Sequence, residues 1–245
     1  MIGDITTVMT KEWREFFSSG GDRRSGLIVL FIIAAILGVY LPFRMGQPWI
    51  TSPFMVLSYS IYLPLILVIN TIADSIAGER ERHTLETLLA SRLSDRAIIL
   101  GKLGAVVGYA LAFTVITALI AMVAANLSGG GSSFQVYPIG VFGSIVAFAL
   151  LFSLLLSSVG VLVSLRASSV RQAQLAMSAA LIVVILLPLL IYSTLSDTMR
   201  QQFNSWIASA NWATVGEIAV VLILIDLIAI AVVILRFQRS RLILS

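Results

Sequence analysis

Long runs of apolar residues, separated by short polar stretches, dominate the chain. Six runs are long enough for helices that cross a hydrocarbon layer of about 30 Å, which takes about 20 residues. They lie near Leu27–Phe43, Phe54–Ala77, Leu103–Asn126, Pro138–Leu165, Ala173–Leu195 and Thr214–Leu235. The second run is the most interrupted, by serine, proline, asparagine and aspartate. The pattern predicts an all-α membrane protein with six transmembrane helices in a single domain over residues 1–245.

The N-terminal stretch, residues 4–20, is amphipathic with helical periodicity. Its apolar residues fall on one face, at Ile5, Val8, Met9, Trp13, Phe16 and Phe17. A helix with aromatic residues on one side and bases on the other lies in the plane of the membrane interface; an ordinary cytosolic helix is the alternative. Charges interrupt the apolar positions too early for a signal peptide. We therefore expect an interfacial helix that ends near Gly20.

A second stretch outside the apolar runs, residues 79–95, begins the most densely charged part of the chain. Between Glu79 and Lys102 there are four acids, five bases and the single histidine. Thr84 is placed to cap a short helix and Ser94 to cap the next one. Leucines spaced for one helical face follow Thr84, at Leu85, Leu88 and Leu89. An apolar patch with a charged rim is typical of a protein docking surface, although a solvated loop is the other interpretation.

Composition supports lipid as the solvent. The chain is 59% hydrophobic and 11% charged, whereas a soluble domain is nearer half apolar and a quarter charged. A chain of 245 residues is too short to bury six such helices in a soluble core. The absence of cysteine excludes disulfides and thiol chemistry, and one histidine cannot supply the H-E-x-x-H motif of a zinc protease.

The lysines and arginines orient the predicted helices. Fourteen of the 16 basic residues flank the runs on one side, and the other two, Arg44 and Arg200, lie on the opposite side. Basic residues concentrate on the cytoplasmic side of membrane proteins. Both termini and the 79–95 segment are therefore expected in the cytoplasm. Because the bases sit at the ends of apolar runs, the net charge of +4 does not indicate nucleic acid as a partner.

The charged part of the chain also resembles a known family. The sequence GERERHTLETLLASRLSDRAIILGKL is similar to a segment of ABC-2 type transporter permeases, in which E-R-x-x-x-T-L-E-x-L-L follows the second span and Gly-Lys opens the third. The matching residues are Glu79, Arg80, Thr84, Leu85, Glu86, Leu88, Leu89, Gly101 and Lys102. Arg92 departs from the pattern, since many relatives have proline there. With its N-terminal helix and six runs, nearly the whole chain resembles a six-span, NatB/NosY-like permease.

The resemblance implies a role for the 79–95 segment. In that family it holds the coupling helix, which docks in a cleft of a separate ATP-binding subunit. The implied contact residues are Glu79, Arg80, Glu81, Thr84, Leu85, Glu86, Leu88 and Leu89. ATP and Mg would then bind the partner, and this chain would hold no cofactor and no metal. The sequence agrees, because its one Gly-Lys, at Gly101, lacks the G-x-x-x-x-G-K-[ST] pattern of a phosphate-binding loop.

The resemblance also implies a cellular location, a second permease subunit and a direction of transport. It places a multi-pass protein in the plasma membrane of a prokaryotic cell, with a second permease copy or a paralogue beside it. Within the lipid bilayer, ATP-driven closure of the partner would reorient the spans by alternating access. Export is the implied direction of transport.

Polar residues within the apolar runs are candidates for a translocation path. Asn70 and Asp74 lie four residues apart in the second run, and Asp226 lies near the middle of the sixth. Ionisable groups inside a membrane are functional candidates by default, although Asp226 also suits a protonated or hydrogen-bonded helix contact. Ser153 and Ser157 begin a stripe of small residues that continues to Gly160 and Ser164. Such stripes, and the Gly104–Gly108 step, also serve ordinary helix packing.

These features leave several function classes to compare. The leading prediction is a transport subunit that is not itself an enzyme. The alternative is an ion-gradient-driven secondary transporter that uses Asp74 and Asp226, but the inverted repeats usual in that class are not visible. An intramembrane enzyme is disfavoured because His83 lies outside the apolar runs. A scaffold that only anchors a partner would tolerate loss of Asp226.

Overall fold

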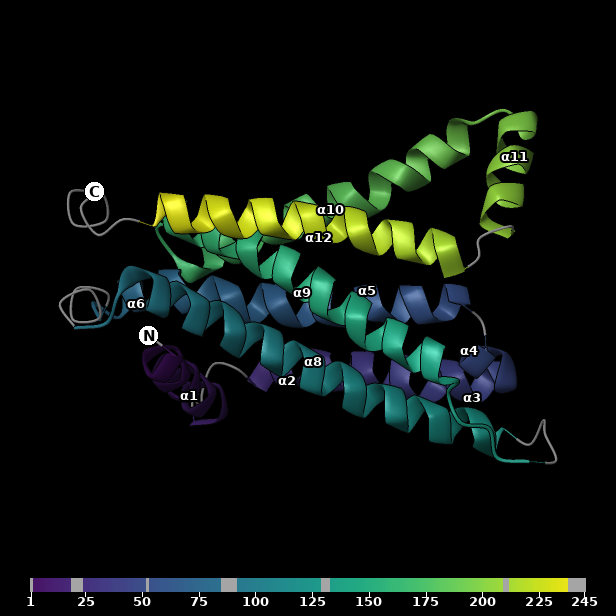
Figure 1. The fold of residues 1–245 in the computed structure, drawn as a ribbon, viewed down its shortest axis with the longest axis horizontal. Coiled ribbons are helices and arrows are strands. Elements are labelled where there is room, and N and C mark those ends of the chain that lie inside the picture. The colour runs from purple at the N-terminus through teal and green to yellow at the C-terminus, as the bar shows by residue number, and fades with distance from the viewer. Residues whose placement is uncertain are drawn as a thin grey trace.

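The fold is a bundle of long helices (Figure 1). The computed structural model describes residues 2–18, 24–51, 53–84, 92–128, 133–208 and 212–237. The helical elements are α1 (Ile2–Ser18), α2 (Arg24–Ala35), η1 (Ile36–Tyr40), α3 (Leu41–Met45), α4 (Gln47–Thr51), α5 (Pro53–Ala73), η2 (Asp74–Gly78), α6 (Glu79–Glu81), α8 (Asp95–Leu127), α9 (Ile139–Arg166), α10 (Val170–Thr194), α11 (Asp197–Ala208) and α12 (Trp212–Arg236). Among the described residues, η1 and η2 are π-helical and the structure has no strand. The predicted all-α class is confirmed.

Four helical stretches are long and apolar enough to cross a membrane. They are Ile61–Glu81, Asp95–Leu127, Ile139–Arg166 and Ala213–Arg236, and they match the second, third, fourth and sixth predicted runs. The first and fifth runs correspond to shorter apolar stretches within the described residues, Phe31–Met45 and Val170–Val183. These helices identify a multi-pass membrane protein. The number of six spans stays a prediction.

The bundle is organised around α9, which packs against α5, α8, α10 and α12. In Figure 1, α5, α9 and α12 run in one direction, and α8 and α10 run in the other. One end of the bundle holds α1, α6, the start of α8 and the end of α12. The other end holds α3, α4 and α11. The charged segment and α1 therefore share one end, and the side of a membrane that this end faces stays a prediction.

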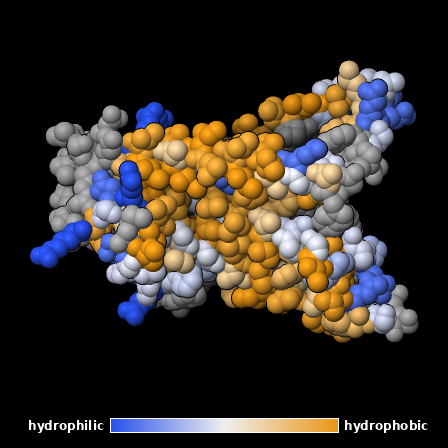
Figure 2. Space-filling model, viewed as in Figure 1, coloured by the Kyte–Doolittle hydropathy of each residue, from blue (hydrophilic) through white to orange (hydrophobic). Residues whose placement is uncertain are grey.

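The surface around the middle of the bundle is apolar (Figure 2). Large hydrophobic side chains are exposed along α2, α10 and α12, including Phe31, Leu187, Leu190, Leu224 and Ile228. Hydrophilic residues gather toward the ends of the bundle. An exposed apolar belt of this extent is unfavourable in water and favourable in lipid, which supports a membrane location.

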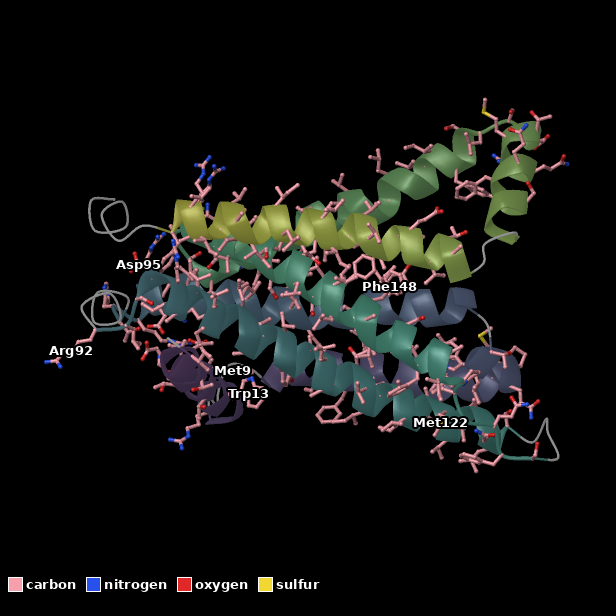
Figure 3. The ribbon with its side chains drawn as sticks, viewed as in Figure 1. Met9, Trp13, Arg92, Asp95, Met122 and Phe148 are labelled. Carbon is pink, nitrogen blue, oxygen red and sulfur yellow. The ribbon has the colours of Figure 1, made fainter. Side chains whose placement is uncertain are left out.

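The N-terminal helix α1 packs against α8. Its apolar face is the predicted one, but part of this face contacts protein: Val8 is buried, and Trp13 Nε1 donates a hydrogen bond of 2.9 Å to the Ala105 carbonyl. Met9 and Trp13 point toward α8 in Figure 3. Glycines on α8 allow the close approach, at Gly101, Gly104 and Gly108. The Gly104–Gly108 step therefore serves packing within the chain, and a position of α1 in the membrane interface stays a prediction.

The start of α8 confirms one predicted cap. Ser94 is the N-cap residue, and its hydroxyl accepts a hydrogen bond of 3.3 Å from the Ala97 amide. Asp95 lies in the first turn, where its charge favours the helix dipole. The helix that Thr84 was expected to cap, and the glycine stop at Gly20, lie outside the described residues.

The helix α11 lies outside the six predicted runs. The stretch between the fifth and sixth runs forms this helix, Asp197–Ala208. Arg200 joins α11 to the end of α10, because its Nε donates to the Tyr192 carbonyl at 3.2 Å. The guanidinium also lies 5.8 Å from the centre of the Tyr192 ring. A basic side chain that binds the last carbonyls of a helix stabilises the turn that follows.

Candidate functional site at the charged end of the bundle

Three consecutive residues of α6, Glu79, Arg80 and Glu81, connect the surrounding helices to one another. Their side chains contact α1, α8, the end of α9 and the start of α10. We call this set of contacts the junction, and it consists of Lys11, Glu12, Glu79, Arg80, Glu81 and Lys102. Its three α6 residues are the first residues of the predicted coupling segment, 79–95. A movement of that segment would therefore reach four helices through α6.

Glu79 is the buried centre of the junction, with 5% of its surface exposed. Its Oε1 accepts a hydrogen bond of 2.7 Å from Lys11 Nζ and lies 3.5 Å from Lys102 Nζ. Its Oε2 accepts a hydrogen bond of 2.5 Å from the Thr84 hydroxyl. Buried charges are tolerated when they are paired and hydrogen-bonded. Glu79 is therefore held by two lysines and one hydroxyl group of its own chain.

Lys102 and Glu12 form a second buried pair in the same cluster. Lys102 Nζ lies 2.6 Å from Glu12 Oε1, and the two residues expose 3% and 4% of their surfaces. This pair fixes α1 to the second turn of α8. Because Lys102 also faces Glu79, one ammonium group joins α1, α6 and α8.

Lys11 closes the cluster at its outer side, with 43% of its side chain exposed. Partial burial lowers the pKa of this amine, but the hydrogen bond to Glu79 and the nearby negative charges outweigh burial. The net effect is a pKa of Lys11 above its ordinary value. Lys11 is therefore positively charged at neutral pH and pairs with both Glu79 and Glu15.

The carboxylates of this cluster are arranged for ion pairing with lysines. One oxygen each of Glu12, Glu15 and Glu79 lies within 4.8 Å of the others, which is close enough to share a cation. The ammonium groups of Lys102 and Lys11 already pair with them, at 2.6 Å for Glu12 and 2.7 Å for Glu79. A metal ion would have to displace these fixed positive charges. The arrangement is that of a salt-bridge cluster.

Arg80 and Glu81 stabilise the two helix ends at the α9–α10 turn. Arg80 donates from Nη1 to the Ala167 carbonyl at 2.7 Å and from Nη2 to the Leu165 carbonyl at 3.2 Å. Glu81 Oε1 accepts a hydrogen bond of 3.0 Å from the Val170 amide. The last carbonyls and first amides of helices lack partners within the helix, and opposite charges stabilise these ends. α6 therefore stabilises the end of α9 through Arg80 and the start of α10 through Glu81.

The π-helical segment η2 leads from α5 into the junction. The Ser164 hydroxyl of α9 bonds to the backbone of this region. It accepts a hydrogen bond of 2.9 Å from the Ala77 amide and donates one of 3.2 Å to the Ala73 carbonyl. Ala77 and Ala73 are the two groups that an α-helix would join directly. A side chain inserted into the helix ladder changes the helical register locally. Ser164 therefore stabilises the register change that brings Glu79 inward.

We expect Ser164→Ala to lower the free energy of unfolding by about 1–3 kcal/mol, because it removes the hydroxyl that accepts from the buried Ala77 amide and donates to the Ala73 carbonyl. Ser157→Ala is the matched control, since Ser157 is also buried on α9 but its hydroxyl has no hydrogen-bond partner among the described residues. Thermal unfolding of the full chain in detergent, followed by circular dichroism, measures both. Equal shifts in the two variants would contradict the role given to Ser164.

The predicted coupling residues divide into two groups. Glu79 and Arg80 were expected at a docking surface, but their side chains bind their own chain. Thr84 is exposed and donates to Glu79, and Glu81 is exposed although it binds the Val170 amide. The other predicted contact residues, Leu85, Glu86, Leu88 and Leu89, lie outside the described residues. Docking of an ATPase on this segment stays a prediction.

The predicted translocation residues do not share one environment. Ser153 and Ser157 are fully buried on α9, and the Ser153 hydroxyl donates to the Leu150 carbonyl at 2.9 Å within the same helix. Asp226 is buried on α12, with 3% of its surface exposed. Asn70 lies in α5 and Asp74 in η2, and their side chains lie outside the described part of the chain. A translocation role for these residues stays a prediction.

The partner residues on α1 were not predicted from the sequence. Glu12 falls on the same helical face as Val8, four residues earlier, and so interrupts the apolar face. A charge in that position indicates a buried partner of opposite sign. Lys102, at the start of an apolar run, indicates the same need. The two residues are separated by 90 positions in the chain, and the sequence pattern did not pair them.

Comparison with known protein families gives an independent indication of function. A family model with the description "ABC-2 family transporter protein" matches residues 50–234. The matched region includes α6 and the long helices from α5 to α12. A search of curated proteins found no match.

Proposed function

The chain belongs to the ABC-2 family of transporter proteins, and we propose that it is a permease subunit driven by a separate ATP-binding subunit at the 79–95 segment. The observation that carries this proposal is the junction. The segment begins at α6, whose three residues bind α1, α8, α9 and α10. Because the family is one of membrane transport subunits, the chain itself is not an enzyme. ATP and Mg would bind the partner.

The junction supports a specific transmission mechanism. When the ATP-binding subunits close, the 79–95 segment moves with them, and Glu79 carries α1 and the start of α8 through Lys11 and Lys102. Arg80 and Glu81 carry the α9–α10 turn at the same time. Ion pairs that are fully buried and hydrogen-bonded transmit such a displacement better than solvated ones, because they separate at a large energetic cost. The spans then alternate between two orientations.

Six spans with the charged end in the cytoplasm form the proposed topology. The helical elements α2, η1 and α3 follow one another without a break over residues 24–45, and α10 has 25 residues. At about 1.5 Å per residue these lengths correspond to about 33 Å and about 37 Å, enough for a hydrocarbon core of about 30 Å. The basic residues at the charged end support a cytoplasmic location. The proposed setting is the plasma membrane of a prokaryotic cell.

The proposed assembly contains two permease subunits and two ATP-binding subunits. A second copy or a paralogue would contact the exposed apolar surfaces of the bundle. Within the family we propose a six-span, NatB/NosY-like exporter. The alternative of a secondary transporter would require ion movement without any ATPase, and it gives no role to the connection between α6 and four helices.

Co-purification tests the proposed function. Tagged full-length chain would be extracted from its native host in mild detergent, and the proteins that accompany it would be identified by mass spectrometry. We expect a subunit with a phosphate-binding G-x-x-x-x-G-K-[ST] loop. Its recovery should fall in Glu86→Ala, within the predicted docking segment, and not in Phe134→Ala, in the link between the end of α8 and the start of α9. Failure to recover any ATPase in several detergents would support the secondary transporter instead.

A further inference from the structure

The helix α12 is held to the rest of the bundle along one narrow strip. Its buried residues are Leu222, Asp226 and Val233, with Phe237 just beyond its end. Leu222 packs with Phe148 and Leu151 of α9, and Val233 and Phe237 belong to the central apolar core. Phe148 is labelled in Figure 3. We call this strip the α12 seam, and the rest of α12 is largely exposed and apolar.

Asp226 interrupts the α12 seam between its two apolar parts. With 3% of its surface exposed, it has no hydrogen-bond partner for either carboxylate oxygen among the described residues. Intramembrane acids in other proteins pair with one another, with backbone groups or with water. A buried ionised carboxylate without a partner is strongly unfavourable in a medium of low dielectric constant. The neutral acid is the form that fits the closed seam.

Among the residues that the structure describes, no fixed positive charge is placed to neutralise Asp226. α12 packs against α9 and, less extensively, against α8. The one charged residue of α9 is Arg166, its last residue, and the charged residues of α8 are Asp95, Arg96 and Lys102 near its start. On α12 itself, Glu217 is exposed near the start and Arg236 is the last residue, ten positions or about 15 Å beyond Asp226. Tyr109 is the remaining titratable side chain of α8.

From this geometry we propose that Asp226 is a proton-binding site that controls the α12 seam. With a proton bound, the neutral carboxyl group remains between α9 and α12 and the seam stays closed. When the proton leaves, the carboxylate requires water or a cation, and α12 separates from α9. The bond that breaks is the carboxyl O–H, and water accepts the proton.

A proton suits the site better than a metal cation. A cation would need several oxygen ligands at once. Besides Asp226, the described residues of α9 offer only two buried hydroxyls without a hydrogen-bond partner, those of Ser157 and Ser158. A proton needs only the carboxylate. The inference does not require the ATP-driven function, because the seam lies within this chain.

Infrared spectroscopy of the full chain in phosphatidylcholine nanodiscs tests the proton site directly. Exposed aspartates and glutamates have pKa values near about 4 and are ionised at neutral pH, so they do not give the absorption of a protonated carboxyl group. We expect that absorption at neutral pH in the wild-type chain, its loss in Asp226→Asn and its retention in Glu217→Gln. An absent band, or a band that survives Asp226→Asn and disappears in Asp74→Asn, would overturn the proposal.

A distance measurement tests control of the seam. The chain has no cysteine, so Val159→Cys and Ile225→Cys would carry the only two spin labels, at exposed positions on α9 and α12. We expect the distance between the labels to lengthen when the buffer changes from neutral to alkaline, and to stay short at both values with Asp226→Asn. A distance that does not depend on pH in the wild-type sequence, or an unchanged response in Asp226→Asn, would refute the gating role.

Discussion

Lys102→Met should lower the free energy of unfolding by about 3–5 kcal/mol, the cost of removing one partner from a buried ion pair. Methionine keeps the length of the side chain and removes its charge. Glu12, which pairs with Lys102 at 2.6 Å, is then left without its main partner in a position that is 4% exposed. Glu79 loses one of its two positive neighbours as well. Thermal and denaturant unfolding of the full chain in detergent would measure the loss.

Two further variants separate the buried pair from a general loss of charge. Lys11→Met removes a lysine from the same cluster, but Lys11 is 43% exposed, so we expect a cost of about 0–1 kcal/mol. Adding Glu12→Gln to Lys102→Met removes the unpaired buried charge and should recover part of the stability. Equal losses in the free energy of unfolding for Lys11→Met and Lys102→Met would contradict the conclusion that the junction has a buried centre.

Gly101→Ala should displace α1 from α8 and destabilise the chain by about 1–3 kcal/mol. A Cβ atom at Gly101 would lie 2.6 Å from Val8 Cβ and 3.1 Å from the Ile5 carbonyl oxygen. Neither atom is the end of a flexible side chain, so the two helices must separate. Separation would also weaken the Glu12–Lys102 pair, which lies next to this contact. Unfolding measurements and the rate of trypsin cleavage at Arg14 would report the change.

Gly104→Ala is the matched control for this prediction. It lies on the same helix three residues later, but a Cβ atom there would be 3.6 Å from Met9 Sδ, an ordinary contact. Alanine is the better helix former by about 0.5–1 kcal/mol, so Gly104→Ala should be neutral or stabilising. If Gly101→Ala were tolerated as well as Gly104→Ala, the close packing of α1 on α8 would be wrong.

Local patterns in the sequence predicted most of the long helices. Four apolar runs correspond to helical stretches of membrane-spanning length, because about 20 apolar residues have few stable alternatives to a transmembrane helix. The helical periodicity of α1 and the Ser94 cap also depend on neighbouring residues alone. Such features are visible in a single sequence.

Features that depend on contacts between distant residues were not predicted. Glu79 was assigned to a docking surface because the family resemblance places it there, whereas its side chain turns inward to Lys11 and Lys102. The register change at η2 depends on Ser164, 87 positions after Ala77. Neither pairing has a local signal, since each depends on how α5, α8 and α9 pack. The α11 helix was missed because a short amphipathic stretch resembles a polar loop.

The structure gives residues of the family motif a role in contacts within the chain. Glu79, Arg80, Gly101 and Lys102 all match the ABC-2 pattern; three of them belong to the junction, and Gly101 allows α1 to approach α8 beside it. Contacts within the chain account for these residue types. Glu79 and Lys102 form ion pairs, Arg80 binds helix carbonyls, and Gly101 allows the close approach of two helices. In the proposed function, the residues that follow Glu81 would then be the ones that contact a partner. Such a division would let one short segment bind a partner and also transmit its movement to the bundle.

Site-specific cross-linking to the partner tests the central claim most directly. A photo-reactive amino acid would replace Arg92, which is exposed at the charged end (Figure 3), and in a second variant Phe134, which is exposed in the link between the end of α8 and the start of α9. After illumination of cells, the adducts of each tagged variant would be identified by mass spectrometry. The account predicts that Arg92 cross-links to an ATP-binding subunit and Phe134 does not. An ATPase adduct at Phe134, or none at Arg92 while an ATPase still co-purifies, would contradict it.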